Sequence, residues 1–122
     1  MGDIPELKPK DLTNQADLEP AKDRMAVWAL TAQGAKLAQK IALNLGFDLF
    51  LPERFEKVHQ AQTFDNLKKA LSERFGHYRG HVIVAATGLV VRIIAPLIAD
   101  KKSDPAVVTL GQDGRFVISL LS

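Results

Sequence analysis

The sequence predicts an α/β fold with three layers and a mostly parallel sheet. Short apolar runs that suit buried strands alternate with segments whose apolar residues recur at helical spacing. The last two strand-like runs are separated by an Asp-Gly turn, which is typical of an antiparallel hairpin. We therefore expect a flavodoxin-like strand order, with the second strand at one edge and the hairpin at the other.

The first expected strand covers residues 25–30, a short apolar run. Thr31 follows it, and its hydroxyl can accept a backbone N–H from the first turn of a helix. Three apolar residues mark one face of that helix and a glycine suits its end, namely Leu37, Ile41, Leu45 and Gly46.

The second expected strand covers residues 47–51 and stops at Pro52, and residues 54–63 are expected to form a loop. A second amphipathic helix follows. Its apolar face is marked by Phe64, Leu67, Leu71 and Phe75.

The third expected strand covers residues 81–86, and residues 88–98 form a helix that is apolar on nearly every face. Pro96 should kink or end this helix, because its ring crowds the carbonyl one turn earlier. Strands over 106–110 and 115–121 complete the hairpin. The first and third strands are continuous apolar runs, so we expect them at the centre of the sheet. The apolar third helix needs cover beyond this sheet, and a partner chain or a further domain would supply it.

The composition predicts one soluble domain over residues 23–122, preceded by a flexible tail over residues 1–22. The tail carries a net charge of −2 and the rest of the chain +4, without the dense basic patch that nucleic-acid binding needs. The chain contains no cysteine. Its start does not resemble a signal peptide, and Arg92 inside the apolar stretch 82–99 argues against a membrane span. We expect a cytoplasmic protein with no nucleic-acid or membrane partner. The apolar ending at Ser122 suggests a fragment of a longer protein.

Two turns are the expected binding site. Residues 31–34 and 85–88 each follow a central strand and open a helix, so their free N–H groups should face a carboxylate or phosphate. The candidate residues are Thr31, Gly34, Thr87, Gly88 and Arg92. Structural roles remain open for all of them: a plain cap for Thr31, a tight turn for residues 87–88, and for Arg92 an ion pair with Asp100 or Asp104.

Other motifs are absent or weak. The sequence has no Gly-x-Gly-x-x-Gly, no phosphate-binding Gly-Lys-Ser/Thr loop and no Gly-x-Ser-x-Gly elbow. His77 and His81 are four residues apart, but Gly80 interrupts any helix there, so surface positions or the start of a strand are expected for them. We expect no bound metal and no cofactor. Asp104-Pro105 suits a turn before a strand.

The order of several segments resembles the N-terminal region of the cobalt-precorrin-5A hydrolase family, CbiG. These segments are AVWALTAQGAKLAQKIA near the start, then TGLVVRIIAPL, Lys101, DPAVV and GRFVISLLS. In the family, the last strand continues into a Gly-His-x-Gly-Gly-Ala-Asn segment, which this sequence does not contain. The resemblance covers roughly residues 25–122.

The resemblance implies a function in anaerobic cobalamin biosynthesis. The family opens the δ-lactone of cobalt-precorrin-5A and releases acetaldehyde. By analogy, this chain would contribute substrate-binding surface through the five candidates above and Asp104. The catalytic residues stay unidentified. The fragment alone is expected to be inactive. The implied partners are the cobalt-precorrin substrate and a C-terminal domain.

The alternative is a non-catalytic docking or dimerisation module, in which a homodimer covers the apolar third helix. A third interpretation is a receiver-like or flavin-binding domain, against which the lack of an acidic cluster after the first strand argues.

Overall fold

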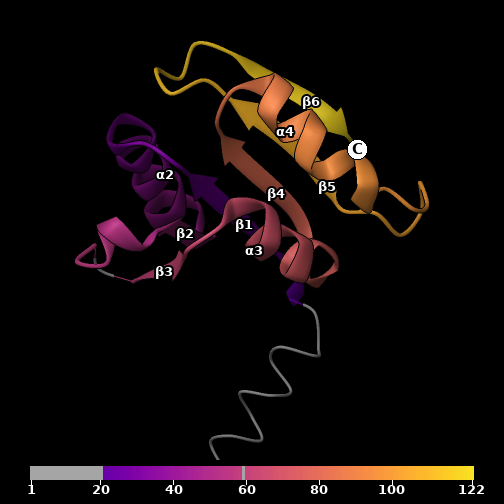
Figure 1. The fold of residues 1–122 in the computed structure, drawn as a ribbon, viewed down its shortest axis with the longest axis horizontal. Helices are drawn as coiled ribbons and strands as arrows, with labels where there is room; N and C mark the ends of the chain where they lie inside the picture. Colours follow the sequence, from indigo (N-terminus) through magenta and orange to yellow (C-terminus); the bar gives the residue numbers. More distant parts are fainter. Residues whose placement is uncertain (1–20, 59) are drawn as a thin grey trace, which may run out of the picture.

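A computed structural model describes residues 21–58 and 60–122 of the chain, and Figure 1 shows their arrangement. Within these residues the strands form one sheet in the order β3-β2-β1-β4-β5-β6. All neighbours are parallel except β5 and β6, which form the antiparallel hairpin expected at the edge. The strands are β1 (Ala21–Ala29), β2 (Asp48–Pro52), β3 (Ala61–Phe64), β4 (Tyr78–Val84), β5 (Ala106–Leu110) and β6 (Val117–Leu121).

Helices cover both faces of the sheet and give the three expected layers. Helix α2 (Ala32–Leu45) packs on one face, whereas α3 (Leu67–Arg74) and α4 (Thr87–Ile94) cover the other, which faces the viewer in Figure 1. Short 3₁₀ turns follow β2, α3 and α4, at Glu53–Phe55, Phe75–His77 and Ala95–Leu97. No helix in the described ranges is long and apolar enough to cross a membrane.

The core is split by the sheet into two apolar clusters. On the α3 and α4 side, Trp28 stacks on Phe50 with the ring centroids 4.2 Å apart. On the α2 side, alternate residues of the same strands, such as Val27 and Leu51, pack against Ala35. The alternation follows the two-residue period of a strand, and it explains why the central strands are continuous apolar runs in the sequence.

The end residues of α2 match the expected caps. The Thr31 hydroxyl accepts the N–H of Gly34 at 3.0 Å, and Gly46 ends the helix at a φ of 72°, in the left-handed region that favours glycine. Helix α3 begins in the same way, because the Asn66 side chain accepts the N–H of Lys69 at 2.9 Å. Helix α4 differs, since Ala86 at its N-cap has no side chain that could accept a hydrogen bond.

Several boundaries differ from the sequence prediction. Residues 61–64 form the edge strand β3 instead of a loop, so the second strand lies one position inside the edge. The five expected strands keep their flavodoxin-like order, and β3 adds outside them. The α-helix of α4 ends at Ile94 and a 3₁₀ turn carries Pro96, as its ring requires. Strand β1 begins at Ala21, two residues inside the expected tail, and the rest of that tail lies outside the described residues.

His81 was expected at the surface or at the start of a strand; the structure confirms a strand position and contradicts a surface one. It is fully buried inside β4. Its Nδ1 accepts a hydrogen bond from Trp28 Nε1 at 3.0 Å, and its Nε2 lies 2.9 Å from the carbonyl oxygen of Phe75. With Nδ1 accepting, the proton lies on Nε2, and a neutral imidazole satisfies both neighbours.

Candidate functional site

The carboxyl ends of β1 and β4 lie side by side at the centre of the sheet, where the strand order reverses. The chain leaves β1 toward β2 on one side, and it enters β4 from the distant edge strand β3. Ligands of open α/β sheets bind at such a point. Thr31, Gly34, Thr87 and Gly88 follow these two strands, so the structure brings four of the six candidates to this edge.

Thr31 is held on two sides at this edge. Besides accepting the Gly34 N–H, its hydroxyl donates to the side-chain oxygen of Gln112, which lies in the turn between β5 and β6. The same turn comes close to α2, because a Cβ built at Gly114 would lie 3.9 Å from Leu37. In Figure 1 this turn extends from the hairpin toward α2. It therefore covers the β1 side of the carboxyl edge.

Gly34 has a packing role that its position explains. A Cβ at this residue would lie 3.2 Å from both the Thr31 hydroxyl oxygen and a methyl group of Val84. Glycine therefore lets α2 approach the sheet closely just beside the switch point.

Arg54 was not expected at this edge. It lies in the 3₁₀ turn after β2, and its guanidinium donates to the carbonyl oxygen of Leu30. The guanidinium also lies over the ring of Phe55, 4.7 Å from its centroid. Neither Arg54 nor Gln112 belongs to a sequence motif, and only their contacts across the fold reveal them.

The β4 side of the same edge is hollow. A cavity of about 260 Å³, here called the carboxyl-edge cavity, lies between the start of α4 and the hairpin. At its base the hydroxyls of Thr87 and Thr109 lie 3.2 Å apart. It is lined by Ala85, Ala86, Thr87, Thr109, Gly111, Phe116 and Ile118, which include no acid, base or histidine.

The start of α4 borders this cavity and presents unsatisfied donors. Its first N–H groups have no partner within the helix, and no side chain of the described residues caps them. Gly88 is exposed, and a Cβ there would meet nothing within 4 Å. Arg92 follows Gly88 by four residues, so both lie on one face of the helix. The exposed guanidinium and the free N–H groups thus make this face attractive to an anion.

Arg92 forms an ion pair with neither Asp100 nor Asp104 in the described part of the chain, where the salt bridges are Arg24–Asp48 and Arg115–Asp113. Asp104 instead accepts the N–H groups of Ala99 and Asp100, at 2.9 and 3.1 Å. It precedes β5 and so lies at the amino ends of the strands. The structure therefore separates Asp104 from the four candidates at the carboxyl edge.

The groups whose pKa shifts most are not at this edge. Burial lowers the pKa of His81 to about 4, against a smaller opposing effect of its contact with the Phe75 carbonyl. Burial also raises the pKa of Tyr78 well above its usual range, helped by the 2.7 Å hydrogen bond that its hydroxyl donates to Asp48. Both residues lie within β4 below its carboxyl end, and their contacts are structural.

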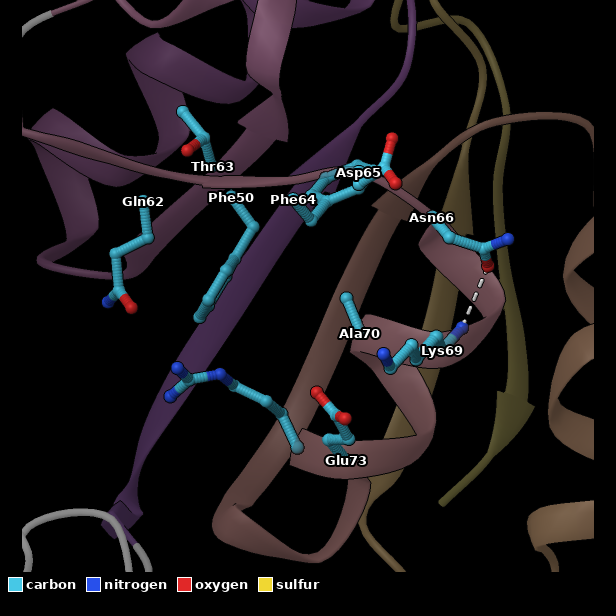
Figure 2. A pocket seen from close by; sticks show the side chains of 10 residues that line it. Phe50, Gln62, Thr63, Phe64, Asp65, Asn66, Lys69, Ala70 and Glu73 are labelled. Atoms are coloured by element: carbon cyan, nitrogen blue, oxygen red, sulfur yellow. Dashed lines mark hydrogen bonds between the residues drawn. The ribbon is translucent and has the colours of Figure 1, made fainter.

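A second hollow of about 250 Å³ lies between the edge strand β3 and helix α3. Figure 2 shows its side chains, with Phe50 pointing into it from the sheet and Lys69 and Glu73 reaching from the helix. Arg74 also lines this hollow, and its guanidinium lies 5.4 Å from the centre of the Phe50 ring. Charges of both signs line it, so its electrostatics favour no one class of ligand. Across the described ranges, no group of three or more His, Cys, Asp or Glu residues could hold a metal ion.

These features define an α/β domain with a candidate ligand site at the switch point of a parallel sheet. Residues 69–122 match the family described as Cobalamin synthesis G N-terminal, CbiG_N. The chain is 35% identical over 100 residues to the cobalt-precorrin-5A hydrolase of Salmonella typhimurium, and 38% identical over 107 residues to that of Priestia megaterium. The expected resemblance to the N-terminal region of the CbiG family is thereby confirmed.

The alignments cover most of this chain but only a small part of each relative. The alignments include 82% and 80% of this chain, whereas the chain spans 28% of the length of each hydrolase. Among solved structures, a cobalamin biosynthesis protein G homolog from Sulfolobus solfataricus superposes with a TM-score of 0.60. That match covers 84% of this chain and 30% of the homolog at 19% identity, and it confirms the α/β fold.

Proposed function

We propose that this chain supplies substrate-binding surface to a cobalt-precorrin-5A hydrolase of cobalamin biosynthesis. The observation that carries the proposal is the uncapped start of α4 beside the carboxyl-edge cavity, with Gly88 and Arg92 on one exposed face. The names of the two curated relatives support the substrate class. A cobalt-precorrin carries many carboxylates, and backbone N–H groups and a guanidinium are suitable donors for them.

The roles of the candidate residues follow from their places. The N–H groups at Thr87 and Gly88 would bind one carboxylate of the substrate, and Arg92 would bind a second oxygen or a neighbouring carboxylate. Thr31 and Gly34 would act on the β1 side, where the Thr31 hydroxyl could exchange Gln112 for a substrate oxygen. Asp104 would contribute only by shaping the loop before β5, since its carboxylate is engaged by two backbone N–H groups.

The proposed reaction is addition of water to the lactone carbonyl of cobalt-precorrin-5A, followed by loss of a two-carbon fragment as acetaldehyde. Such a step needs a general base near the water. The residues that line the carboxyl-edge cavity include none. We therefore expect this chain alone to bind substrate without turning it over. Acetaldehyde release by the purified chain would contradict this division of roles.

The test is an absorbance titration of the chain with a cobalt corrinoid whose side chains end in free carboxylates. We expect saturable binding that weakens by roughly one to two orders of magnitude in Arg92→Ala, since one charge-assisted hydrogen bond contributes about 1.5–3 kcal/mol. Arg115→Ala is the matched control, because Arg115 is exposed and pairs with Asp113 in the hairpin turn. Absence of binding by the folded wild-type chain would refute the proposal.

A docking or dimerisation module is the second candidate, and exposed apolar side chains favour it. Leu89, Val91 and Ile98 of α4 and its following turn are 40%, 44% and 48% exposed. The β6 edge adds Val117, which is 67% exposed. Two features of the described residues speak against a purely docking role: Arg92 belongs to neither salt bridge, and a cavity lies beside the start of α4. Sedimentation over a range of concentrations separates the two functions, because only a dimerisation module would associate without corrinoid.

A further inference from the structure

The apolar half of the carboxyl-edge cavity has no role in the binding of carboxylates. Phe116 and Ile118 line it from the hairpin, and they are 66% and 43% exposed. A phenylalanine that leaves most of its surface in water does not stabilise the core. Together with Ile118 it forms an exposed apolar surface beside the cavity, against which a ligand can pack.

The register of the hairpin shows which face these side chains occupy. Ile118 is paired with Thr109, and Thr109 contacts Thr87 on the α4 side of the sheet. Phe116 lies just before β6 and lines the same cavity as Ile118. Val91 follows Thr87 by one turn of α4, so an exposed apolar residue of the helix continues the same side. The cavity thus has an apolar wall toward the hairpin and hydrogen-bond donors toward the start of α4.

Such a division selects one kind of occupant. A fully apolar ligand would leave the free N–H groups of α4 without partners. A small hydrophilic anion would leave the apolar wall in water. A molecule with an apolar, flat body and carboxylates at its periphery satisfies both sides at once.

We infer that Phe116 and Ile118 form a subsite for the apolar body of an amphipathic carboxylate ligand, whose charged groups lie at the start of α4. The ligand's ring packs against the Phe116 side chain, and its carboxylate accepts the N–H groups near Gly88. The identity of the ligand rests on the proposed function. Its amphipathic nature is inferred from the two walls of the cavity alone.

Two corrinoids test whether the two walls bind different parts of the ligand. The first has free carboxylates, and in the second the same carboxylates are converted to amides. Phe116→Ala should weaken binding of both corrinoids roughly tenfold, because both carry the ring. Arg92→Ala should weaken binding of the acid form alone. Ile118→Ala should act like Phe116→Ala with a smaller effect, and Leu43→Ala on α2, 82% exposed and outside this cavity, should change neither.

A probe unrelated to corrinoids separates this inference from the proposed function. Anilinonaphthalene sulfonate joins an apolar ring system to an anionic group and fluoresces when the ring leaves water. We expect its fluorescence with the wild-type chain to fall at least severalfold with Phe116→Ala. If corrinoids fail to bind but this dye binds through Phe116, the proposed function is wrong and the amphipathic subsite stands. If acid corrinoids bind through Arg92 and neither ligand responds to Phe116→Ala or Ile118→Ala, the subsite is wrong.

A second copy of the chain is an alternative occupant of this wall, and sedimentation detects it. A dimer in the wild-type chain that Phe116→Ala converts to a monomer would assign the wall to a chain–chain contact and overturn the inference. A monomer in both proteins, with the dye response described above, supports the subsite.

Discussion

The hydrogen bond between Trp28 and His81 links a buried polar pair to the stability of the central strands. Trp28 Nε1 donates to His81 Nδ1, and both side chains are fully buried between the sheet and α3. An unsatisfied indole N–H in this position would cost about 1–3 kcal/mol. His81 therefore stabilises the fold as an acceptor, which it can be only as a neutral imidazole.

The pH dependence of folding should reveal this neutral histidine. Its pKa is about 4 in the folded chain and 6.5 when the side chain is fully exposed to water, so the unfolded chain binds more protons between these values. The contribution of neutral His81 to the free energy of unfolding should be fully present above pH 6.5. It should decrease by roughly 3 kcal/mol as the pH falls to 4. In His81→Gln, whose amide can still accept from Trp28, the free energy of unfolding should depend less on pH. Denaturant titrations at several pH values measure the difference, and parallel pH profiles for the two proteins would contradict it.

At the scale of single helices, the caps of α2 make separable contributions. Thr31→Ala removes the acceptor of the Gly34 N–H and the donor to Gln112, and we expect a loss of about 1 kcal/mol in the free energy of unfolding. Thr31→Ser should retain most of the stability, because serine keeps the hydroxyl. Gln112→Ala distinguishes the two contacts. If it costs as much as Thr31→Ala, the bond to the hairpin turn is the important one, and the cap is not.

The other end of α2 depends on backbone conformation alone. Gly46 adopts a φ of 72°, and a Cβ there would meet nothing within 4 Å. Gly46→Ala should therefore destabilise the chain by roughly 1–2 kcal/mol through the left-handed backbone, without any clash. Gly76→Ala is the control, since Gly76 also has open space around it but no positive φ. Equal effects in thermal unfolding would show that the conformation is not the cause.

Elements with local signals were predictable from the sequence, whereas contacts between distant segments were not. Apolar periodicity and the Thr31 and Gly46 caps locate α2 within one residue or so. Strand β3 was missed because its four residues are too few for a pattern, and its middle pair is exposed at the sheet edge. At the site, four candidates follow from the strand ends. Arg54 and Gln112 could not be found, because each contacts a residue that is distant in sequence. Arg54 donates to Leu30, 24 positions earlier, and Gln112 accepts from Thr31, 81 positions earlier.

At the scale of the whole molecule, stability should decrease from the centre of the sheet to its edges. Strands β1 and β4 have a neighbour on each side and helices on both faces, whereas β3 and β6 each pair on one side within the described sheet. We expect the slowest amide hydrogen exchange in β1 and β4 and the fastest strand exchange in β3 and β6. Slow exchange in β6 that becomes fast on dilution would instead indicate a second chain at that edge.

The burial of Trp28 also makes the chain its own optical probe. The sequence has one tryptophan, and its indole is fully enclosed, stacked on Phe50 and bonded to an imidazole. Its fluorescence should therefore be blue-shifted in the folded state and move to the red when the centre of the sheet opens. Because His81 is the hydrogen-bond partner of Trp28, protonation of His81 at acid pH should change the tryptophan emission. A corrinoid bound at the carboxyl edge would quench the same signal through energy transfer. Folding, protonation and binding can thus be followed by the fluorescence of an unlabelled protein.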